Sequence, residues 1–215
     1  MPIFYEQKPF DEKDKEEAIT ALREAARPDR DFYLLVMGAT LFALFGIALD
    51  SVPVLIGSMI VAPLAAPILA LGLGLAITDE RLVLRSLVTL LVACIGASLL
   101  AGTIGHFLPV FSVNGTFISF IAHPFYDITI ALIAGAIAAY GYVRTKISGA
   151  LTGIGIAVSL MPPLVASSLA IRSLDIPLLR ESSVIFIVNI AGILLGSLLV
   201  FIIFGMHKPH PHTQK

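Results

Sequence analysis

Four prolines lie inside apolar stretches that are otherwise typical of membrane-spanning helices. Pro63 and Pro67 are four residues apart, and Pro162 and Pro163 are adjacent. A proline inside a helix removes one backbone hydrogen bond and clashes with the carbonyl four residues earlier, at a cost of roughly 3 kcal/mol. In hydrocarbon the freed carbonyls have no water to bind, so protein, an ion or a water-filled cavity must satisfy them. Paired interruptions at corresponding positions of two halves of a chain indicate a transport site.

Uncharged side chains that carry oxygen lie close to these prolines. Hydroxyl, amide and carbonyl oxygens are hard ligands that suit Na⁺ or a zwitterionic solute, and the N-terminus of a half-helix can hold a carboxylate without an arginine. The alternative is two kinked helices closed off by their neighbours, with Asn189 only holding two helices together. The candidate solute- and ion-binding residues are Ser58, Pro63, Pro67, Ser159, Pro162, Pro163, Ser167, Ser168 and Asn189.

Acidic and nucleophilic residues are scarce in the apolar stretches. Asp50 and Asp127 fall at expected helix ends, which favours Na⁺ coupling or passive exchange over a buried proton carrier. Cys94 is the only cysteine, so it forms no internal disulfide and is expected to be a small packing residue. The sequence contains no His-Glu-x-x-His motif and no nucleophile elbow. We therefore predict no enzyme, no catalytic residue and no cofactor, with Na⁺ as the candidate coupling ion.

The composition requires lipid as the solvent for much of the chain. Of the 215 residues, 57% are hydrophobic and 13% are charged, and the mean hydropathy is +0.94. A soluble domain carries about 25% charged residues, which this chain lacks. The net charge of −1 says nothing about a nucleic-acid partner, but the sequence has no basic patch that would hold one. Segments of about 20 apolar residues span a bilayer, and we expect six of them, near 32–49, 54–76, 83–105, 127–143, 148–171 and 183–204.

The two halves of the sequence resemble each other at an offset of about 100 residues. Residues 61–66 then align with residues 161–166, each in the second helix of a group of three. Because three is odd, the second copy enters the membrane inverted. We therefore predict an all-α polytopic membrane protein with two inverted three-helix repeats, whose second and fifth helices are broken at prolines. The expected parts are a polar segment 1–30, repeat 31–107, outer loop 108–126, repeat 127–205 and polar tail 206–215.

The distribution of lysine and arginine predicts the orientation. With the N-terminus inside, 12 of the 14 lie on the cytoplasmic side, and only Arg172 and Arg180 lie outside. Both termini are then cytoplasmic. The stretch from Asp11 to Arg27 fits a short amphipathic helix ended by Pro28, either solvated or lying on the cytoplasmic membrane surface. The three histidines of the tail are expected to be disordered rather than to bind a metal.

Several motifs of the chain resemble those of a known prokaryotic family. They are Arg30-Asp31-Phe32-Tyr33-Leu34-Leu35, the stretch from Val54 to Leu64 with Val61-Ala62-Pro63-Leu64, Pro67-Ile68-Leu69 with Gly72-Leu73-Gly74, and Leu160-Met161-Pro162-Pro163-Leu164. They are similar to the hydrophobic membrane proteins of domain-of-unknown-function family 389. The resemblance covers most of residues 30–204. It implies a prokaryotic inner (plasma) membrane protein with a transporter-like role, and it specifies no substrate.

Together these features favour a secondary transporter of a small polar solute such as an amino acid, Na⁺-coupled and working by alternating access. An ion channel and a non-transporting structural membrane protein are the alternatives. Six short helices provide little wall for a moving unit, so we expect a homo-oligomer, either a dimer or a trimer, with an elevator-like movement of the broken helices. Its contacts are expected on small-residue faces such as Gly192 with Gly196 and Gly149 with Gly153.

Overall fold

The computed structural model describes residues 12–108, 124–143 and 160–206, and every regular element in these ranges is a helix. This confirms the all-α class. The helices are α1 (Glu12–Ala25), α2 (Arg30–Ala48), α3 (Val52–Val61), α4 (Ala65–Ala76), α5 (Glu80–Phe107), α7 (Pro124–Val143), α9 (Met161–Ser173) and α10 (Ile176–Ile203).

Aspartate side chains begin three of these helices. Asp29, Asp79 and Asp175 each accept a hydrogen bond from the backbone N–H three residues later, at 2.8–3.1 Å. An N-cap of this kind satisfies one of the four N–H groups that a helix start leaves without a partner. The caps therefore fix the residue at which each of α2, α5 and α10 begins. Apolar composition alone does not specify these first residues.

Within the described ranges, four helices are long and apolar enough to cross a membrane, namely α2, α5, the part of α7 from Tyr126 to Val143, and α10. The pair α3 and α4 makes a fifth if it is taken as one span bent by 47°. Half of the remaining expected span, 148–171, lies outside the described residues, and the 13-residue α9 represents the other half. The chain is therefore a helical protein with several apolar helices suited to a membrane.

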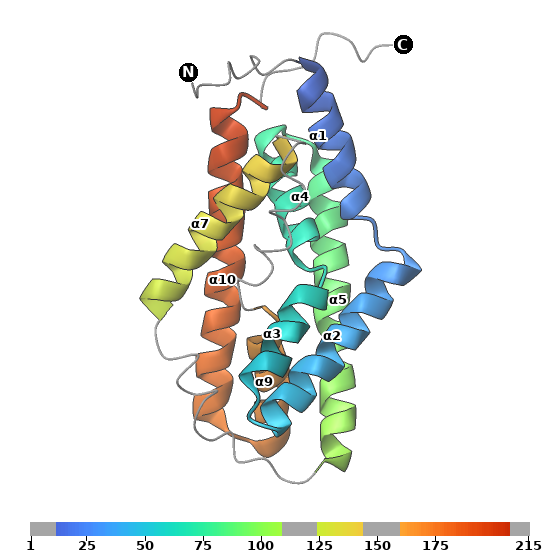
Figure 1. The fold of residues 1–215 in the computed structure, drawn as a ribbon, viewed down its shortest axis with the longest axis vertical. Coiled ribbons are helices and arrows are strands. Elements are labelled where there is room, and N and C mark those ends of the chain that lie inside the picture. Colours follow the sequence, from blue (N-terminus) through green and yellow to red (C-terminus); the bar gives the residue numbers. More distant parts are fainter. Residues whose placement is uncertain (1–11, 109–123, 144–159, 207–215) are drawn as a thin grey trace, which may run out of the picture.

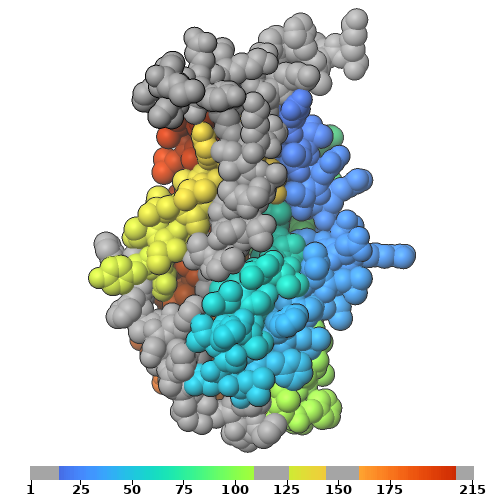
Figure 2. All heavy atoms as spheres, viewed as in Figure 1, coloured from blue at the N-terminus to red at the C-terminus, as the bar shows by residue number. Residues whose placement is uncertain are grey.

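The two longest helices run in opposite directions along the whole molecule (Figure 1). Both α5 and α10 have 28 residues. The shorter α4 packs against α5 and α10, and α9 likewise packs against α10 and α5. Outside this centre, α2 contacts α3, α5 and α9, whereas α7 packs mainly along α10. In the space-filling view, α2 and α3 form one continuous surface (Figure 2).

Glycines bring α7 and α10 into backbone contact. A Cβ added to Gly196 would collide with the Leu132 carbonyl, and one added to Gly135 would collide with the backbone of Ile193. A Cβ at Gly192 would lie 2.5 Å from the Ala131 Cβ. The face of Gly192 and Gly196 that we expected between subunits is therefore used inside the chain, against α7. Gly149 and Gly153 lie outside the described residues.

The helix α1 packs on the bundle, which differs from both expectations for it. Ala18, Ile19 and Leu22 are buried, and α1 contacts α4 and α7. At its far end, the Arg23 guanidinium forms an ion pair of 2.6 Å with Asp79, at the corner between α4 and α5. The apolar face of α1 thus covers protein rather than lipid headgroups, because α4 and α7 offer it an apolar surface.

Replacement of Gly196 by alanine is expected to destabilise the fold, because the added methyl group overlaps the Leu132 carbonyl. Overpacking of this kind costs about 1–3 kcal/mol. Gly38→Ala is the matched control, since a Cβ at Gly38 meets nothing within 4 Å and alanine is the better helix former by about 1 kcal/mol. Thermal unfolding in detergent should show a lower midpoint for G196A alone. Equal midpoints for the two variants would contradict the close α7–α10 contact.

Asp79 is expected to give the corner between α4 and α5 a pH-dependent stability. Partial burial opposes its ionisation, but the Leu82 N–H and the Arg23 guanidinium outweigh this and hold the pKa of the Asp79 carboxyl below 3.8. Since the folded pKa is the lower one, the stabilisation is present above about pH 4 and is lost as the pH falls through the folded pKa. Asp79→Ala removes both the N-cap hydrogen bond of α5 and the ion pair with Arg23. Arg23→Ala removes only the ion pair, which is exposed.

We therefore expect D79A to lower the unfolding free energy by about 1–2 kcal/mol at pH 7, and R23A by about 1 kcal/mol or less. Unfolding midpoints measured from pH 7 down to pH 3 test this. The gap between wild type and D79A should narrow towards pH 3. A gap that stays constant over this range would contradict the assigned role.

Candidate functional site

Pro63 lies in the break between α3 and α4. The helix α3 ends at Val61, and its last backbone bond runs from the Ala62 N–H to the Ser58 carbonyl at 3.1 Å. Because Pro63 has no N–H, the Met59 carbonyl loses the helical partner that it would otherwise have. The break therefore occurs as predicted, and it leaves carbonyl oxygens at the end of α3 available for another ligand.

The other three prolines begin helices and do not interrupt them. Pro67 is the third residue of α4, and Pro162 and Pro163 are the second and third residues of α9. The N–H groups of the first helical turn have no partner within the helix, so proline costs little there. The expectation that Pro67 interrupts the second helix is therefore wrong. Residues 144–159, with Ser159, lie outside the described part, so a break in the fifth helix is not tested.

The geometry of two helical corners recurs 96 residues apart. Thr78 and Leu174 both have a φ of 55°, and each is followed by the aspartate that caps the next long helix. The Asp79 N–H bonds the Gly74 carbonyl at 2.9 Å, as the Asp175 N–H bonds the Ala170 carbonyl at 3.0 Å. Ile176, the start of α10, likewise lies 96 positions after Glu80, the start of α5.

This spacing differs from the alignment offset of about 100 residues by about one helical turn. At an offset of 96, Pro163 falls on Pro67, whereas the sequence alignment placed it on Pro63. Apolar segments resemble one another at several offsets, because leucine, alanine and valine replace each other freely. A corner of the same kind also follows α2, where Asp50 has a φ of 48° and the Ser51 N–H bonds the Gly46 carbonyl at 2.9 Å. The corners at Thr78 and Leu174 differ from it in that an aspartate side chain caps the helix that follows.

The candidate serines mostly bond their own helices. Ser58 is buried and donates to the Leu55 carbonyl at 2.6 Å. Ser168 is buried and donates to the Leu164 carbonyl at 2.9 Å. Asn189 is also buried, in the middle of α10. Backbonding of this kind occupies the hydroxyl proton and leaves the oxygen lone pairs for a cation or a donor.

Ser167 belongs to a group of three hydroxyls that joins α9 to α10. Its Oγ lies 2.7 Å from the Pro163 carbonyl and 3.0 Å from the Ser182 Oγ. The Ser183 Oγ lies 3.4 Å from it, and Ser182 donates to the Leu178 carbonyl at 2.6 Å. The sequence analysis did not single out Ser182 and Ser183. The sequence did contain a signal for them. The two serines are adjacent and lie about two turns into α10, and the preceding helix carries Ser167.

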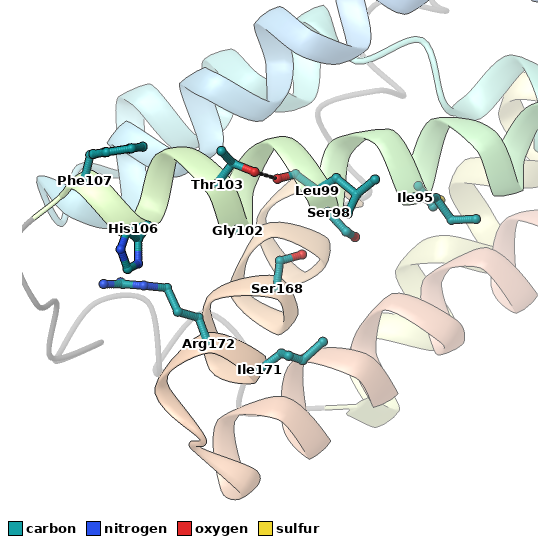
Figure 3. Close-up of a pocket in the computed structure, with 11 residues that line it drawn as sticks. Ile95, Ser98, Leu99, Gly102, Thr103, His106, Phe107, Ser168, Ile171 and Arg172 are labelled. Atoms are coloured by element: carbon teal, nitrogen blue, oxygen red, sulfur yellow. Dashed lines mark hydrogen bonds between the residues drawn. The ribbon is translucent and has the colours of Figure 1, made fainter.

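A groove of about 700 Å³ runs between α5 and α9 (Figure 3). Of the nine candidate residues, Ser168 alone is among its lining residues. Its walls are mostly apolar, and the His106 and Arg172 side chains lie together at one end of it. The lining residues are Cys94, Ile95, Ser98, Leu99, Gly102, Thr103, His106 and Phe107 of α5, and Ser168, Ile171 and Arg172 of α9.

A second groove of about 390 Å³ lies between α2 and α5. Tyr33, Val36 and Met37 line it from α2, and Gly96 and Ala97 are among the residues that line it from α5. Within the described ranges, no three His, Cys, Asp or Glu side chains come together as a metal site.

The family model described as "Domain of unknown function (DUF389)" matches residues 59–195, from the end of α3 to the middle of α10. The chain belongs to this family. The match confirms the family resemblance, and it includes the α3–α4 break, the first turn of α9 and both helical corners.

A relative with similar sequence is an uncharacterized protein of the archaeon Methanocaldococcus jannaschii. The two are 32% identical over 204 residues, which cover 91% of this chain and 63% of the relative. The chain therefore spans less than two thirds of that curated relative. No solved structure matches the chain.

The contact between α9 and α10 is expected to depend on the Ser167 and Ser182 hydroxyls together. We expect a double-mutant cycle of S167A and S182A to give a coupling of about 0.5–1.5 kcal/mol in unfolding free energy, as for interhelical hydrogen bonds in membranes. Ser58→Ala combined with S182A is the control pair, because the Ser58 hydroxyl bonds within α3. If the changes in unfolding free energy are additive for S167A with S182A, as they are expected to be for the control pair, the hydroxyl group does not link α9 to α10.

Proposed function

We propose that the chain is a multi-pass transporter of the prokaryotic inner membrane, which moves a small polar solute by alternating access. Its termini are cytoplasmic, and α1 lies at the cytoplasmic end. Six spans form two inverted three-helix units, α2 to α5 and α7 to α10. Among the described residues, α9 represents the fifth span.

The matched packing of the two units supports this arrangement. Both α4 and α9 are short helices that lie between α5 and α10, and the two long helices run in opposite directions. A rotation that exchanges α5 with α10 therefore also exchanges α4 with α9. Inverted repeats of this kind build many secondary transporters, with the solute site where the broken helices meet.

The α7–α10 interface of one unit corresponds to the α2–α5 interface of the other. The observation that carries the proposal is that the first interface is closed and the second is open. Gly192 of α10 packs tightly against Ala131 of α7. The corresponding Gly96 of α5 faces open space, since a Cβ there meets nothing within 4 Å. The groove of about 390 Å³ lies beside Gly96, between α2 and α5.

An exchange of these two packings would convert one access state into the other. Closing α2 on α5 would bring Gly96 against α2, as Gly192 now lies against α7. Opening α7 from α10 would create a groove at the opposite end. The units thus have two packings built from the same elements, and alternating access requires two such states.

The half-helices provide the solute site in this proposal. The break leaves carbonyl oxygens at Met59, and α9 begins with buried prolines whose helix start carries a partial positive charge. Hydroxyl and carbonyl oxygens around Ser58 and Ser167 suit Na⁺, and the helix starts suit the carboxylate of an amino acid. An ion channel is the second candidate, because the carbonyl oxygens freed at Pro63 also suit an ion pathway.

Uptake of labelled amino acids into proteoliposomes, with and without a Na⁺ gradient, tests the proposal. We expect gradient-dependent uptake that falls at least tenfold in Gly96→Leu, because the leucine fills the space into which α2 must close. Gly38→Leu is the control, since Gly38 also faces open space but does not line the groove. Pro63→Ala, which restores an N–H for the Met59 carbonyl, is also expected to reduce uptake.

The variants must keep the unfolding midpoint of the wild type for this comparison. Uptake in G96L equal to that of G38L would overturn the alternating packing. Single-channel currents without accumulation of any solute would favour the channel, and the absence of both activities would favour a structural role.

A further inference from the structure

The groove between α5 and α9 opens sideways on the apolar surface of the molecule. Leu99, Phe107 and Ile171 line it and are 67%, 81% and 61% exposed. From Cys94 to Phe107 the groove follows 13 residue steps of α5, about 20 Å at 1.5 Å per residue. One leaflet of the hydrocarbon core is about 15 Å thick. The groove is therefore long enough for an acyl chain, and a free polar solute would not be retained in it.

Small residues on α5 create this groove. Ser98 and Gly102 line it, and a Cβ added to Gly102 meets nothing within 4 Å. The residues 96 positions later on α10 are Leu194 and Leu198, which pack against the core. At these two positions α5 therefore has small residues where α10 has leucines.

The polar end of the groove has no counterpart in the other half. His106 and Arg172 lie near each other there, from the last turns of α5 and α9 (Figure 3). The corresponding residues are Ile202 and Ala76. Among the described residues, no carboxylate forms an ion pair with Arg172. An arginine also offsets the dipole at the end of α9, but that role requires neither the histidine nor the groove.

We propose that this groove is a binding site for an anionic phospholipid, with an acyl chain along α5 and the phosphate held by Arg172 and His106. Arginine matches the geometry of phosphate oxygens and donates two parallel hydrogen bonds to them. Both side chains lie at the end of the span, where a headgroup sits, and the apolar walls lie below it. The site is separate from the α3–α4 break, but Leu99 and Thr103 also line the α2–α5 groove, and Ser168 is one of the candidate solute-binding residues. Its test is lipid binding, which is measured without transport.

The test compares lipid binding to the purified, delipidated full chain in detergent by native mass spectrometry and thermal shift. We expect dioleoyl phosphatidylglycerol to bind more tightly than dioleoyl phosphatidylcholine. Arg172→Ala should reduce this preference about fivefold, since one basic residue near anionic lipid is worth about 1 kcal/mol. His106→Ala should reduce it as well, and Arg172→Lys should retain part of it. Arg180→Ala is the control, an exposed arginine of α10 outside the groove.

The variant Gly102→Leu tests the binding of the acyl chain separately from the binding of the headgroup. It gives α5 the residue that α10 has at Leu198, and it should weaken both lipids without changing the unfolding midpoint in lipid-free detergent. Glycerol phosphate alone should not stabilise the protein. Equal binding of the two lipids by the wild type, equal losses in R172A and R180A, unchanged lipid binding in G102L, or stabilisation by glycerol phosphate would each overturn the proposal.

Discussion

In an apolar environment, each backbone N–H and C=O group has to find its partner within the protein, and the fold of this chain follows that constraint. Aspartates at 29, 79 and 175 satisfy the first turns of three helices. Prolines stand in the first turns of α4 and α9, where no N–H is needed. Hydroxyls inside the helices, such as Thr40 and Ser168, donate to carbonyls four residues earlier. Pro63 is the exception, because it lies between α3 and α4 and supplies no N–H for the Met59 carbonyl.

The contrast between α7–α10 and α2–α5 shows how small residues can have opposite uses. At Gly192 and Gly196, the missing side chains let two helix backbones touch, so these residues contribute to stability. At Gly96 and Gly102, the missing side chains leave space next to a helix. Glycine content on its own does not distinguish the two cases. Only the position of the neighbouring helix decides whether a glycine closes a contact or opens a groove.

The helix α5 lines both of the grooves described above. Residues between Val92 and Thr103 line the groove towards α2, and residues between Cys94 and Phe107 line the groove towards α9. A lipid bound between α5 and α9 would lie next to the helix that α2 is proposed to approach. The lipid composition of the membrane could in this way influence the packing of the first unit, with α5 as the shared wall.

The sequence by itself determined the helical class, the apolar segments, the break at Pro63 and the family. These follow from local chemistry: about 20 apolar residues span a bilayer, and a proline inside a helix removes a backbone bond wherever it stands. The sequence also predicted a helix in the N-terminal segment, with an apolar face at Ala18, Ile19 and Leu22. The sequence did not predict which surface this face packs against. A short amphipathic helix can bury its apolar face either in the membrane surface or against the rest of the protein.

Only the tertiary structure showed that corners of the same geometry, each followed by a capping aspartate, recur at Thr78 and Leu174, 96 residues apart. It also decided the use of each small residue. The pairing of Ser167 with Ser182, and of His106 with Arg172, joins residues of different helices. Such pairs depend on helix rotation and depth, which are set by packing between helices and leave no local signal in the sequence.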